Sequence, residues 1–489
     1  MRKLSGADSL FIFNENAQRH QHTLKIAIVD PAGADTDVTY EALRAQMREA
    51  LPLLEPFRWQ LVRIPFDLAH PYWMDVGDVD IDYHVRRIAV PSPGGPRELA
   101  EVISMIASIG LDRDHPLWQV WFVEGLATGH VAYVTKVHHA LADGMSSARL
   151  LAEIAGEHAD TTPMPASDAL AGEPVPGRAA MLRRGSRDFV QMAAELPALL
   201  TRTWRYSRAL RARTRSGAPR AAKPFAGPHT RFDQPLTSSR WFAYETFALD
   251  DIKHVAHAFD ATVTDTVVAM VSGGLRRYLS RHGEVPARPL TAAIPVSVRK
   301  RGEERAWGNR VASWYVTLAT DVDDPARRMR EIVDATRAAR AELEATDPEL
   351  QHAWAEYWRL FRLATFAFPR MMRPLVHRPS YNVIISTVPG PPRPLYRHGA
   401  RIVHMISMGP LEEGMGINFT GWSYAGEMTI AMMSCREHAP DIWDLTGDLR
   451  ASLEELAAAV PAPESPTRSV PPRRTHRRPE SGRRAPRHP

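Results

Sequence analysis

The feature that most constrains the fold is an alternation of strand-like and helix-like segments. It occurs in both halves of the chain, which a segment of different composition separates. In the first half, residues 22–30 alternate like a strand, and residues 118–126 and 130–138 resemble two strands joined by a short turn. In the second half, strand-like runs at 291–298 and 416–435 flank helical segments. Strands separated by helices in both halves predict an α/β fold with two mixed-sheet domains. The length of 489 residues also favours more than one core.

Composition places the expected boundaries. We expect an N-terminal domain over residues 1–160 and a C-terminal domain over residues 241–460. Between them, residues 161–240 are rich in Pro, Ala and Arg, and we interpret them as a linker with crossover helices. The tail at 461–489 is too rich in Pro and Arg to bury a core, so we expect it to be disordered.

Positive charge is concentrated in two segments. The tail carries +6 and residues 178–223 carry +10, so the rest of this +5 chain carries −11. Within the second segment, Phe189 to Arg213 predicts one or two basic amphipathic helices interrupted at Pro197. Two interpretations stay open, namely a helix lying on a membrane and a crossover helix packed across both domains with its arginines in solvent.

Targeting signals and cysteine usage bear on location. Cys435 is the single cysteine, which fits a reducing compartment. The first residues do not resemble a signal peptide, and no apolar run has the length of a membrane span. We expect a cytoplasmic protein that is soluble or bound peripherally to a membrane or lipid-droplet surface.

One stretch stands out for chemistry: His138-His139-Ala-Leu-Ala-Asp143-Gly144, where a strand ends and a helix is expected to begin. A histidine near neutral pKa suits removal of a proton from an alcohol or amine. Adjacent side chains on a strand point to opposite faces, which disfavours one shared metal ion. Taken alone, the histidines also fit ordinary core or surface positions, and Asp143-Gly144 also fits a plain turn.

This stretch has the pattern His-His-x-x-x-Asp-Gly of the coenzyme A-dependent acyltransferase superfamily. Further motifs resemble one branch of it, the bacterial wax ester synthase/diacylglycerol acyltransferases. In chain order they are Leu4-Ser5-x-x-Asp8-x-x-Phe11, Phe57-Arg58-Trp59, Asp82-Tyr83-His84-Val85, Pro116-Leu117-Trp118, Ile294-Pro295-Val296-Ser297-x-Arg299, Gly308-Asn309-Arg310-Val311 and Ser386-Thr-Val-Pro389-Gly390-Pro391. The resemblance covers residues 4–455, nearly all of the chain except the tail.

The resemblance implies two chloramphenicol acetyltransferase-like domains with the active site at their interface. His139 is then the catalytic base that activates the acceptor alcohol, without an acyl-enzyme. Structural support of the site falls to His138, Asp143, Gly144 and Arg299, with Arg299 the expected partner of Asp143. Donors to the oxyanion, or other substrate contacts, are expected among Asn309, Ser386 and backbone N–H groups near Gly390.

The expected reaction moves a long-chain acyl group from acyl-CoA to diacylglycerol or a fatty alcohol. Acyl-CoA is a substrate, and neither a resident cofactor nor a metal is indicated. Two alternatives remain, namely a condensation-type enzyme acting on another alcohol or amine, and a non-catalytic lipid-binding homologue. We expect no nucleic-acid partner, because the arginines of the tail lack interleaved aromatic residues. The sequence leaves the oligomeric state unknown.

Overall fold

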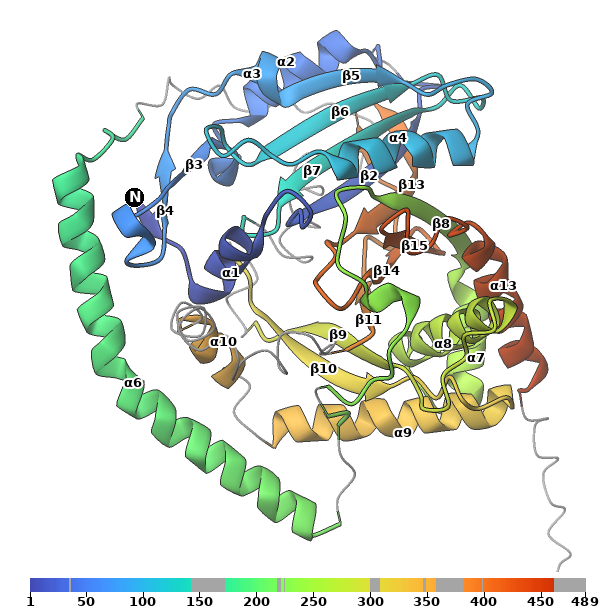
Figure 1. The fold of residues 1–489 in the computed structure, drawn as a ribbon. Helices are drawn as coiled ribbons and strands as arrows, with labels where there is room; N and C mark the ends of the chain where they lie inside the picture. Colours follow the sequence, from blue (N-terminus) through green and yellow to red (C-terminus); the bar gives the residue numbers. More distant parts are fainter. Residues whose placement is uncertain are drawn as a thin grey trace, which may run out of the picture.

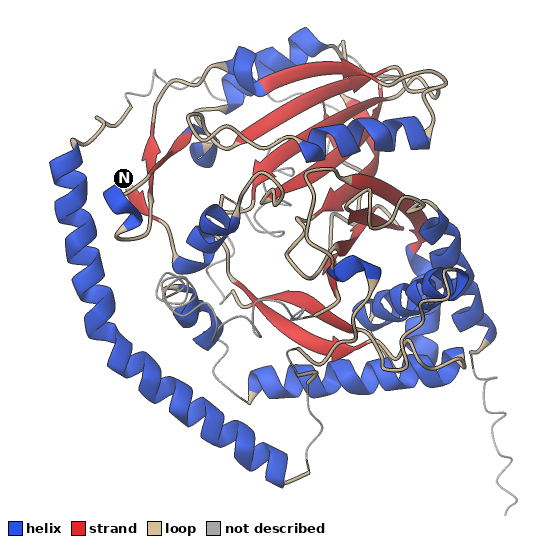
Figure 2. Cartoon of the chain, viewed as in Figure 1, coloured by secondary structure: helices blue, strands red, loops and turns tan. Residues whose placement is uncertain are grey.

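The fold is that of a computed structural model of the chain. The residues that the structure describes are 1–34, 37–141, 172–217, 221–223, 225–299, 308–345, 349–357, 381–397 and 399–460. They form two six-stranded sheets with covering helices, a small three-stranded sheet and one long outer helix (Figures 1 and 2). Both large sheets contain parallel and antiparallel pairs, so the prediction of two mixed-sheet α/β domains is confirmed.

The first large sheet has the order β12-β13-β2-β7-β6-β5. Its N-terminal strands are β2 (His22–Asp30), β5 (Val85–Ala89), β6 (Trp118–Glu124) and β7 (Val131–His138). The predicted strand at 22–30 and the predicted hairpin of β6 and β7 are therefore confirmed. Residues of α4 (Pro96–Ser108) and α2 (Tyr40–Ala50) belong to two separate apolar cores, which include residues from alternating positions of β2 and β7.

Smaller elements complete the N-terminal half. The strands β1 (Arg2–Lys3), β4 (Tyr72–Asp75) and β3 (Trp59–Val62) pair into the three-stranded sheet, and α3 (Ile81–His84) precedes β5. Short 3-10 helices lie at Glu55–Arg58 and Pro65–Asp67 in this half, and another lies at Arg231–Asp233, after the long outer helix. Helix α1 (Gly6–Asn14) is capped by Ser5, whose hydroxyl accepts a hydrogen bond from the Asp8 N–H.

The second large sheet has the order β10-β9-β11-β14-β15-β8. Its strands are β8 (Trp241–Ala248), β9 (Thr291–Ser297), β10 (Val311–Thr317), β11 (Val383–Val388), β14 (Ile417–Tyr424) and β15 (Glu427–Ser434). The expected hairpin within 416–435 is confirmed, with its turn at Ala425 and Gly426. Both turn residues have positive φ, which glycine adopts at little cost.

A layer of helices covers one face of this sheet (Figure 1). It contains α7 (Leu249–Ala258), α8 (Val263–Arg281), α9 (Pro325–Glu344) and α13 (Asp444–Ala458), which share one apolar core. Helix α8 is capped by Thr262, whose hydroxyl forms a reciprocal capping box with Asp265.

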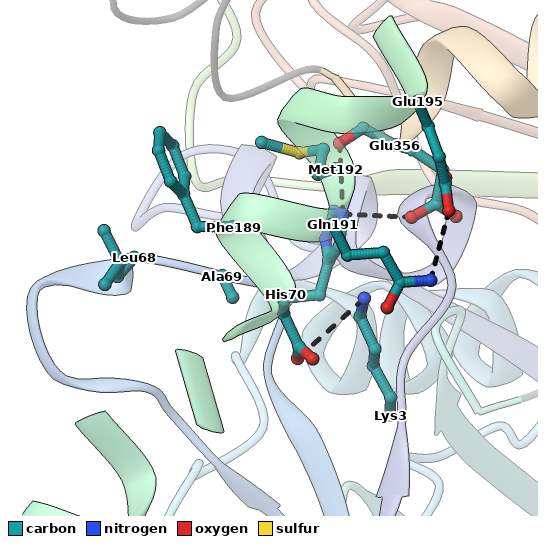
Figure 3. A pocket seen from close by; sticks show the side chains of 10 residues that line it. Lys3, Leu68, Ala69, His70, Phe189, Gln191, Met192, Glu195 and Glu356 are labelled. Carbon is teal, nitrogen blue, oxygen red and sulfur yellow. Dashed lines mark hydrogen bonds and ion pairs between the residues drawn. The ribbon is translucent and has the colours of Figure 1, made fainter. Parts of the chain in front are cut away.

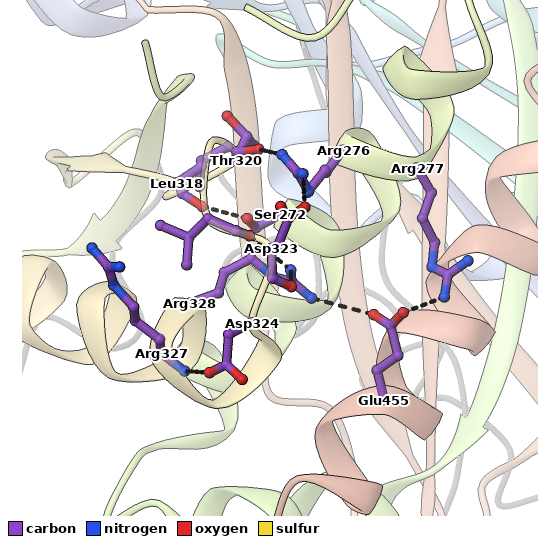
Figure 4. A network of polar contacts seen from close by, with 11 residues as sticks. Ser272, Arg276, Arg277, Leu318, Thr320, Asp323, Asp324, Arg327, Arg328 and Glu455 are labelled. Carbon is purple, nitrogen blue, oxygen red and sulfur yellow. Dashed lines mark hydrogen bonds and ion pairs between the residues drawn. The ribbon is translucent and has the colours of Figure 1, made fainter. Parts of the chain in front are cut away.

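A buried arginine ties three of these helices together (Figure 4). Arg328 of α9 is 2% exposed and donates to the carbonyls of Val322 and Asp323, each at 3.1 Å. It also donates to Glu455 of α13 at 3.3 Å, and Arg277 of α8 contacts the same carboxylate. The burial of Arg328 is tolerated because several oxygen atoms compensate for the water that its guanidinium loses.

Two strands from the second half of the sequence belong to the first sheet. The chain leaves β11, forms β12 (Tyr396–Arg397) and β13 (Ala400–Met408), and then returns to β14. Strand β13 pairs antiparallel with β2, with Ser407 opposite Lys25. The two halves therefore share main-chain hydrogen bonds as well as side-chain contacts.

The middle segment contains one long helix, where one or two interrupted helices were expected. Helix α6 runs from Arg178 to Arg215 and passes through Pro197. Proline removes one helical hydrogen bond, the one to the carbonyl four residues earlier, at Ala193. Ala193 and Pro197 lie on the exposed face, where water hydrates that carbonyl, and Thr201 donates to the Pro197 carbonyl at 2.9 Å. The interruption expected at Pro197 is therefore wrong.

Some expectations lie outside the described residues. They are the helix expected after His139, from about residue 145 to 157, and the basic tail at 461–489. Helix α10 (Leu350–Ala355) is the last described helix before β11. No helix among the described residues is long and apolar enough to cross a membrane.

Candidate active site

A cavity of about 560 Å³ lies between the two large sheets. One wall comes from α1 and from β2 and β13 of the first sheet, and the opposite wall from β9, β10, β11 and β14 of the second. On β11 the alternation of a strand explains the lining, because Ile384, Ser386 and Val388 face the cavity while Val383 and Ile385 enter the core. His139, Asn309 and Ser386 all line this cavity.

His139 follows the last residue of β7 and is fixed through its main chain. Its N–H donates to the carbonyl of Gln21 at 2.7 Å, and its carbonyl accepts from Asn309 Nδ2 at 2.7 Å. Its ring stacks on Phe11 of α1, with the ring centroids 4.3 Å apart. Contacts from α1, from the residue before β2 and from the second half of the chain therefore hold one imidazole at the cavity wall.

Asn309 connects this histidine to the N-terminal helix. Its Nδ2 also donates to Asp8 Oδ1 at 2.7 Å, and its backbone N–H donates to the same oxygen at 2.9 Å. Ser5 donates to Asp8 Oδ2 at 2.7 Å. Burial raises the pKa of the Asp8 carboxyl, and these hydrogen bonds partly oppose the rise. Both amide hydrogens of Asn309 are engaged in an Asp8–Asn309–His139 connection, which we call the clamp.

His138 is fully buried and lies away from the cavity lining. Its Nδ1 accepts from the Ala140 N–H at 3.1 Å, and its Nε2 lies 3.5 Å from a Glu15 carboxylate oxygen. Arg113 donates to the same carboxylate oxygen at 2.9 Å. Burial raises the pKa of Glu15, but the contacts with His138 and Arg113 outweigh it and lower the pKa to about 2. His138 thus connects the end of β7 to the end of α1.

The other predicted residues lie in different surroundings. Arg299 donates to the Gly308 carbonyl at 2.7 Å, while its expected partner Asp143, like Gly144, lies outside the described residues. The N–H of Gly390 donates to Ser423 Oγ at 3.1 Å, and Gly390 does not line the cavity. A Cβ at this position would lie 2.1 Å from the Ser423 carbonyl oxygen, so close packing explains the glycine.

Sequence reasoning missed several polar groups at this cavity, and two of them lie on paired strands. Lys25 is 4% exposed, donates to Ser407 Oγ and lies 4.9 Å from the centre of the Trp422 ring. Both Lys25 and Ser407 line the cavity. The available signal was a lysine in the middle of a strand, directly before the apolar run Ile26–Val29. Ser407 had no local signal, because its position depends on the pairing of β13 with β2.

The two mixed sheets with a cavity between them form a fold of the chloramphenicol acetyltransferase-like class, and His139 lies at that cavity. Two family models match the chain, the wax ester synthase/diacylglycerol acyltransferase catalytic domain over residues 4–267 and the WS/DGAT C-terminal domain over residues 307–457. The chain therefore belongs to the wax ester synthase/diacylglycerol acyltransferase family. As the resemblance predicted, it is an acyl-CoA-dependent O-acyltransferase.

Individual relatives agree along most of their length. Two putative diacylglycerol O-acyltransferases of Mycobacterium tuberculosis are 34% and 36% identical, covering 93% and 94% of this chain and 90% and 97% of their own. The solved wax ester synthase/diacylglycerol acyltransferase of Marinobacter aquaeolei is 28% identical with a TM-score of 0.68, covering 94% of this chain and 99% of its own. A condensation domain of the calcium-dependent antibiotic synthetase, at 17% identity, covers 94% of this chain and 98% of its own; its TM-score of 0.59 shows the shared fold.

Proposed function

We propose that the protein transfers a long-chain acyl group from acyl-CoA to the free hydroxyl of diacylglycerol, forming triacylglycerol, and that fatty alcohols are a second acceptor class. The observation that carries the proposal is His139, held from both halves of the chain at the wall of a cavity that spans them. The names of the relatives support diacylglycerol and wax ester chemistry. A lipid acceptor of this kind is supplied from a membrane or lipid-droplet surface, where we expect the enzyme to work.

The proposed reaction needs one base. The His139 imidazole takes the proton of the acceptor hydroxyl as the oxygen attacks the thioester carbonyl carbon. The tetrahedral intermediate then collapses, the C–S bond breaks, and the coenzyme A thiolate takes the proton from the imidazolium. No acyl-enzyme forms, because the acceptor oxygen is itself the nucleophile.

The oxyanion of that intermediate needs a donor. Among the three predicted candidates, Asn309 already donates both amide hydrogens to the clamp, and the Gly390 N–H is bonded to Ser423. Ser386, whose side chain faces the cavity from β11, is therefore the donor that we propose. Asn309 becomes a positioning residue, and we keep the predicted supporting roles of His138, Asp143, Gly144 and Arg299.

A product profile tests the proposed substrates. The purified protein is offered palmitoyl-CoA together with diacylglycerol, monoacylglycerol and hexadecanol, and the lipid products are separated and quantified. Triacylglycerol as the main product, with wax ester second, is expected. Acylation of other alcohols or of amines only would favour a condensation-type enzyme. Lipid binding without turnover would leave a non-catalytic homologue.

A further inference from the structure

Helix α6 has an exposed apolar stripe. Leu182, Phe189, Val190, Leu200 and Trp204 are 39%, 39%, 67%, 52% and 59% exposed. At 3.6 residues per turn, these five side chains fall within an arc of about 100° around the helix axis, so they share one face. Exposing this much apolar surface on one side of one helix costs free energy unless something else covers it.

The stripe differs from the face that packs on the protein. Only Met181, Gly185 and Leu199 are buried in this 38-residue helix. Met181 packs with Ile64 and Tyr72, and Leu199 packs with Leu350 and Tyr357. Two apolar clusters therefore attach the helix, one with residues of each half of the chain. Between them α6 runs around the outside of the molecule (Figure 1).

Polar contacts complete the inner face near the N-terminal attachment (Figure 3). Lys3 lies 3.9 Å from Asp188, and Gln191 donates to Glu195 at 3.1 Å. His70 contacts Glu356, the residue after α10, beside them. Asp188 and Glu195 are the two acidic residues of α6, and both have partners on or beside its inner face. The outer side of α6 therefore carries no acidic residue.

The charge of α6 suits an anionic surface. Its sequence has ten arginines against two acidic residues, and Arg183, Arg187, Arg205 and Arg208 are exposed beside the apolar stripe. Because the chain outside residues 178–223 and the tail carries −11, an anionic surface attracts the α6 side of the protein and repels the rest. Apolar residues flanked by arginines are typical of helices that lie at the lipid–water interface.

A groove beside this helix shares a lining residue with the catalytic cavity. It has a volume of about 360 Å³ and is lined by Thr203 and Tyr206 of α6, Trp314 of β10 and Trp354 of α10. Ser313 lines both this groove and the catalytic cavity. A lipid surface at the C-terminal half of α6 would therefore lie beside the site where its lipids react.

We propose that α6 docks the enzyme on an anionic lipid surface, with Phe189, Leu200 and Trp204 inserted among the acyl chains and the flanking arginines on the headgroups. The delivery of lipid acceptor to the groove rests on the proposed function. The docking itself does not, because it follows from the exposed stripe and the charge of the helix.

Flotation of the full-length protein with lipid vesicles, in the absence of any substrate, tests the docking. Wild type floats with vesicles of phosphatidylcholine and phosphatidylglycerol and binds phosphatidylcholine vesicles more weakly. The double substitution Leu200→Ser/Trp204→Ser weakens partitioning at least about tenfold, from the loss of buried apolar area. Leu53→Ser is the matched control, since Leu53 is 50% exposed outside α6, and it leaves partitioning unchanged.

A charge variant tests the second part. Replacing Arg183, Arg187, Arg205 and Arg208 by Gln removes the preference for anionic vesicles. The partition coefficient for these vesicles falls roughly fivefold for each arginine that contacts the surface. Wild type that does not float with anionic vesicles, or a double serine variant that floats like wild type, overturns the proposal. The proposal is also overturned if the double serine variant keeps its vesicle binding but loses self-association or DNA binding. The exposed stripe would then contact a second copy of the protein or a nucleic acid, and not a lipid surface.

The same preparations separate this proposal from the proposed function. Acylation of a water-soluble short-chain alcohol by a short-chain acyl-CoA, without vesicles, stays within about twofold in the double serine variant, as for other substitutions outside the site. Vesicle binding by a protein without any acyl transfer would support docking and refute the proposed function. Acyl transfer without vesicle binding would support the proposed function and refute docking.

Discussion

The two halves of this protein are joined at two places that differ in almost every respect. At the centre, β13 completes the first sheet and the clamp ties Asp8 and Asn309 to His139, with both side chains buried. At the periphery, α6 contacts both halves but buries only three of its residues. A joint made of short, buried hydrogen bonds fixes atoms in place, whereas a sparsely packed helix leaves most of its surface for other contacts. We therefore propose that the central joint serves catalysis and that the peripheral one serves attachment to a lipid surface.

Among substitutions that leave His139 itself unchanged, the largest effect is expected from Asn309→Ala in the central joint. The substitution removes both hydrogen bonds of the clamp and frees the main chain of His139 to shift. A displacement of about 1 Å is enough for a loss of ~100-fold in kcat. Steady-state kinetics with palmitoyl-CoA and diacylglycerol measure it.

The matched control is Asn382→Ala. Asn382 is buried like Asn309 and donates to the Pro228 carbonyl at 2.7 Å, but it lies outside the cavity lining. Both variants lose about 1–3 kcal/mol of stability from unpaired buried groups. Equal kcat in the two variants would show that the clamp only stabilises the fold.

A second expected effect concerns Glu15, which anchors His138. Its folded-state pKa of about 2 lies below the ordinary 4.5, so its stabilisation is fully present above pH 4.5 and is lost as the pH falls toward 2. Glu15→Gln should lower the free energy of unfolding by roughly 2–3 kcal/mol at pH 7 and by clearly less at pH 3.5.

Chemical denaturation at the two pH values measures this difference. Glu454→Gln, a change at an exposed glutamate of α13, is the control and leaves stability within about 0.5 kcal/mol. A destabilisation by Glu15→Gln that is the same at pH 3.5 and pH 7 would contradict an ionised Glu15 beside His138.

The smallest effect is expected in the peripheral joint. Arg205→Met changes an exposed arginine of α6, and stability should shift by no more than about 0.5 kcal/mol. Arg328→Met on α9 removes a buried arginine that three helices share, and a loss of about 3 kcal/mol is expected. Thermal unfolding of both variants tests this contrast, and similar losses would mean that α6 is packed as tightly as α9.

Local patterns predicted much of the fold. Strand-like patterns identified β2, β6, β7, β9, β14 and β15. The exchange of β13 into the first sheet was not predictable, because strand pairing between distant segments leaves no local pattern. The continuity of α6 was missed because Pro197 was assumed to end the helix, although exposure allows water to replace the lost hydrogen bond.

The site also has features that the local sequence predicts and features that depend on contacts between distant segments. The position of His139 at the end of β7 followed from the motif, since a strand end holds a side chain at a cavity edge. The engagement of Asn309 and Gly390 in other hydrogen bonds depends on contacts between segments far apart in the chain, with Asp8 and with Ser423. Residue type alone cannot tell a free donor from one that is already bonded.

The assignment of His139 as the base is tested most directly by single-turnover acyl transfer in His139→Ala, with palmitoyl-CoA and diacylglycerol both saturating. A positioned base contributes ~10²–10⁴-fold, so the rate should fall by that factor while the thermal unfolding temperature stays within a few degrees of wild type. Retention of more than about a tenth of the wild-type rate would contradict the assignment, because a general base contributes more than that.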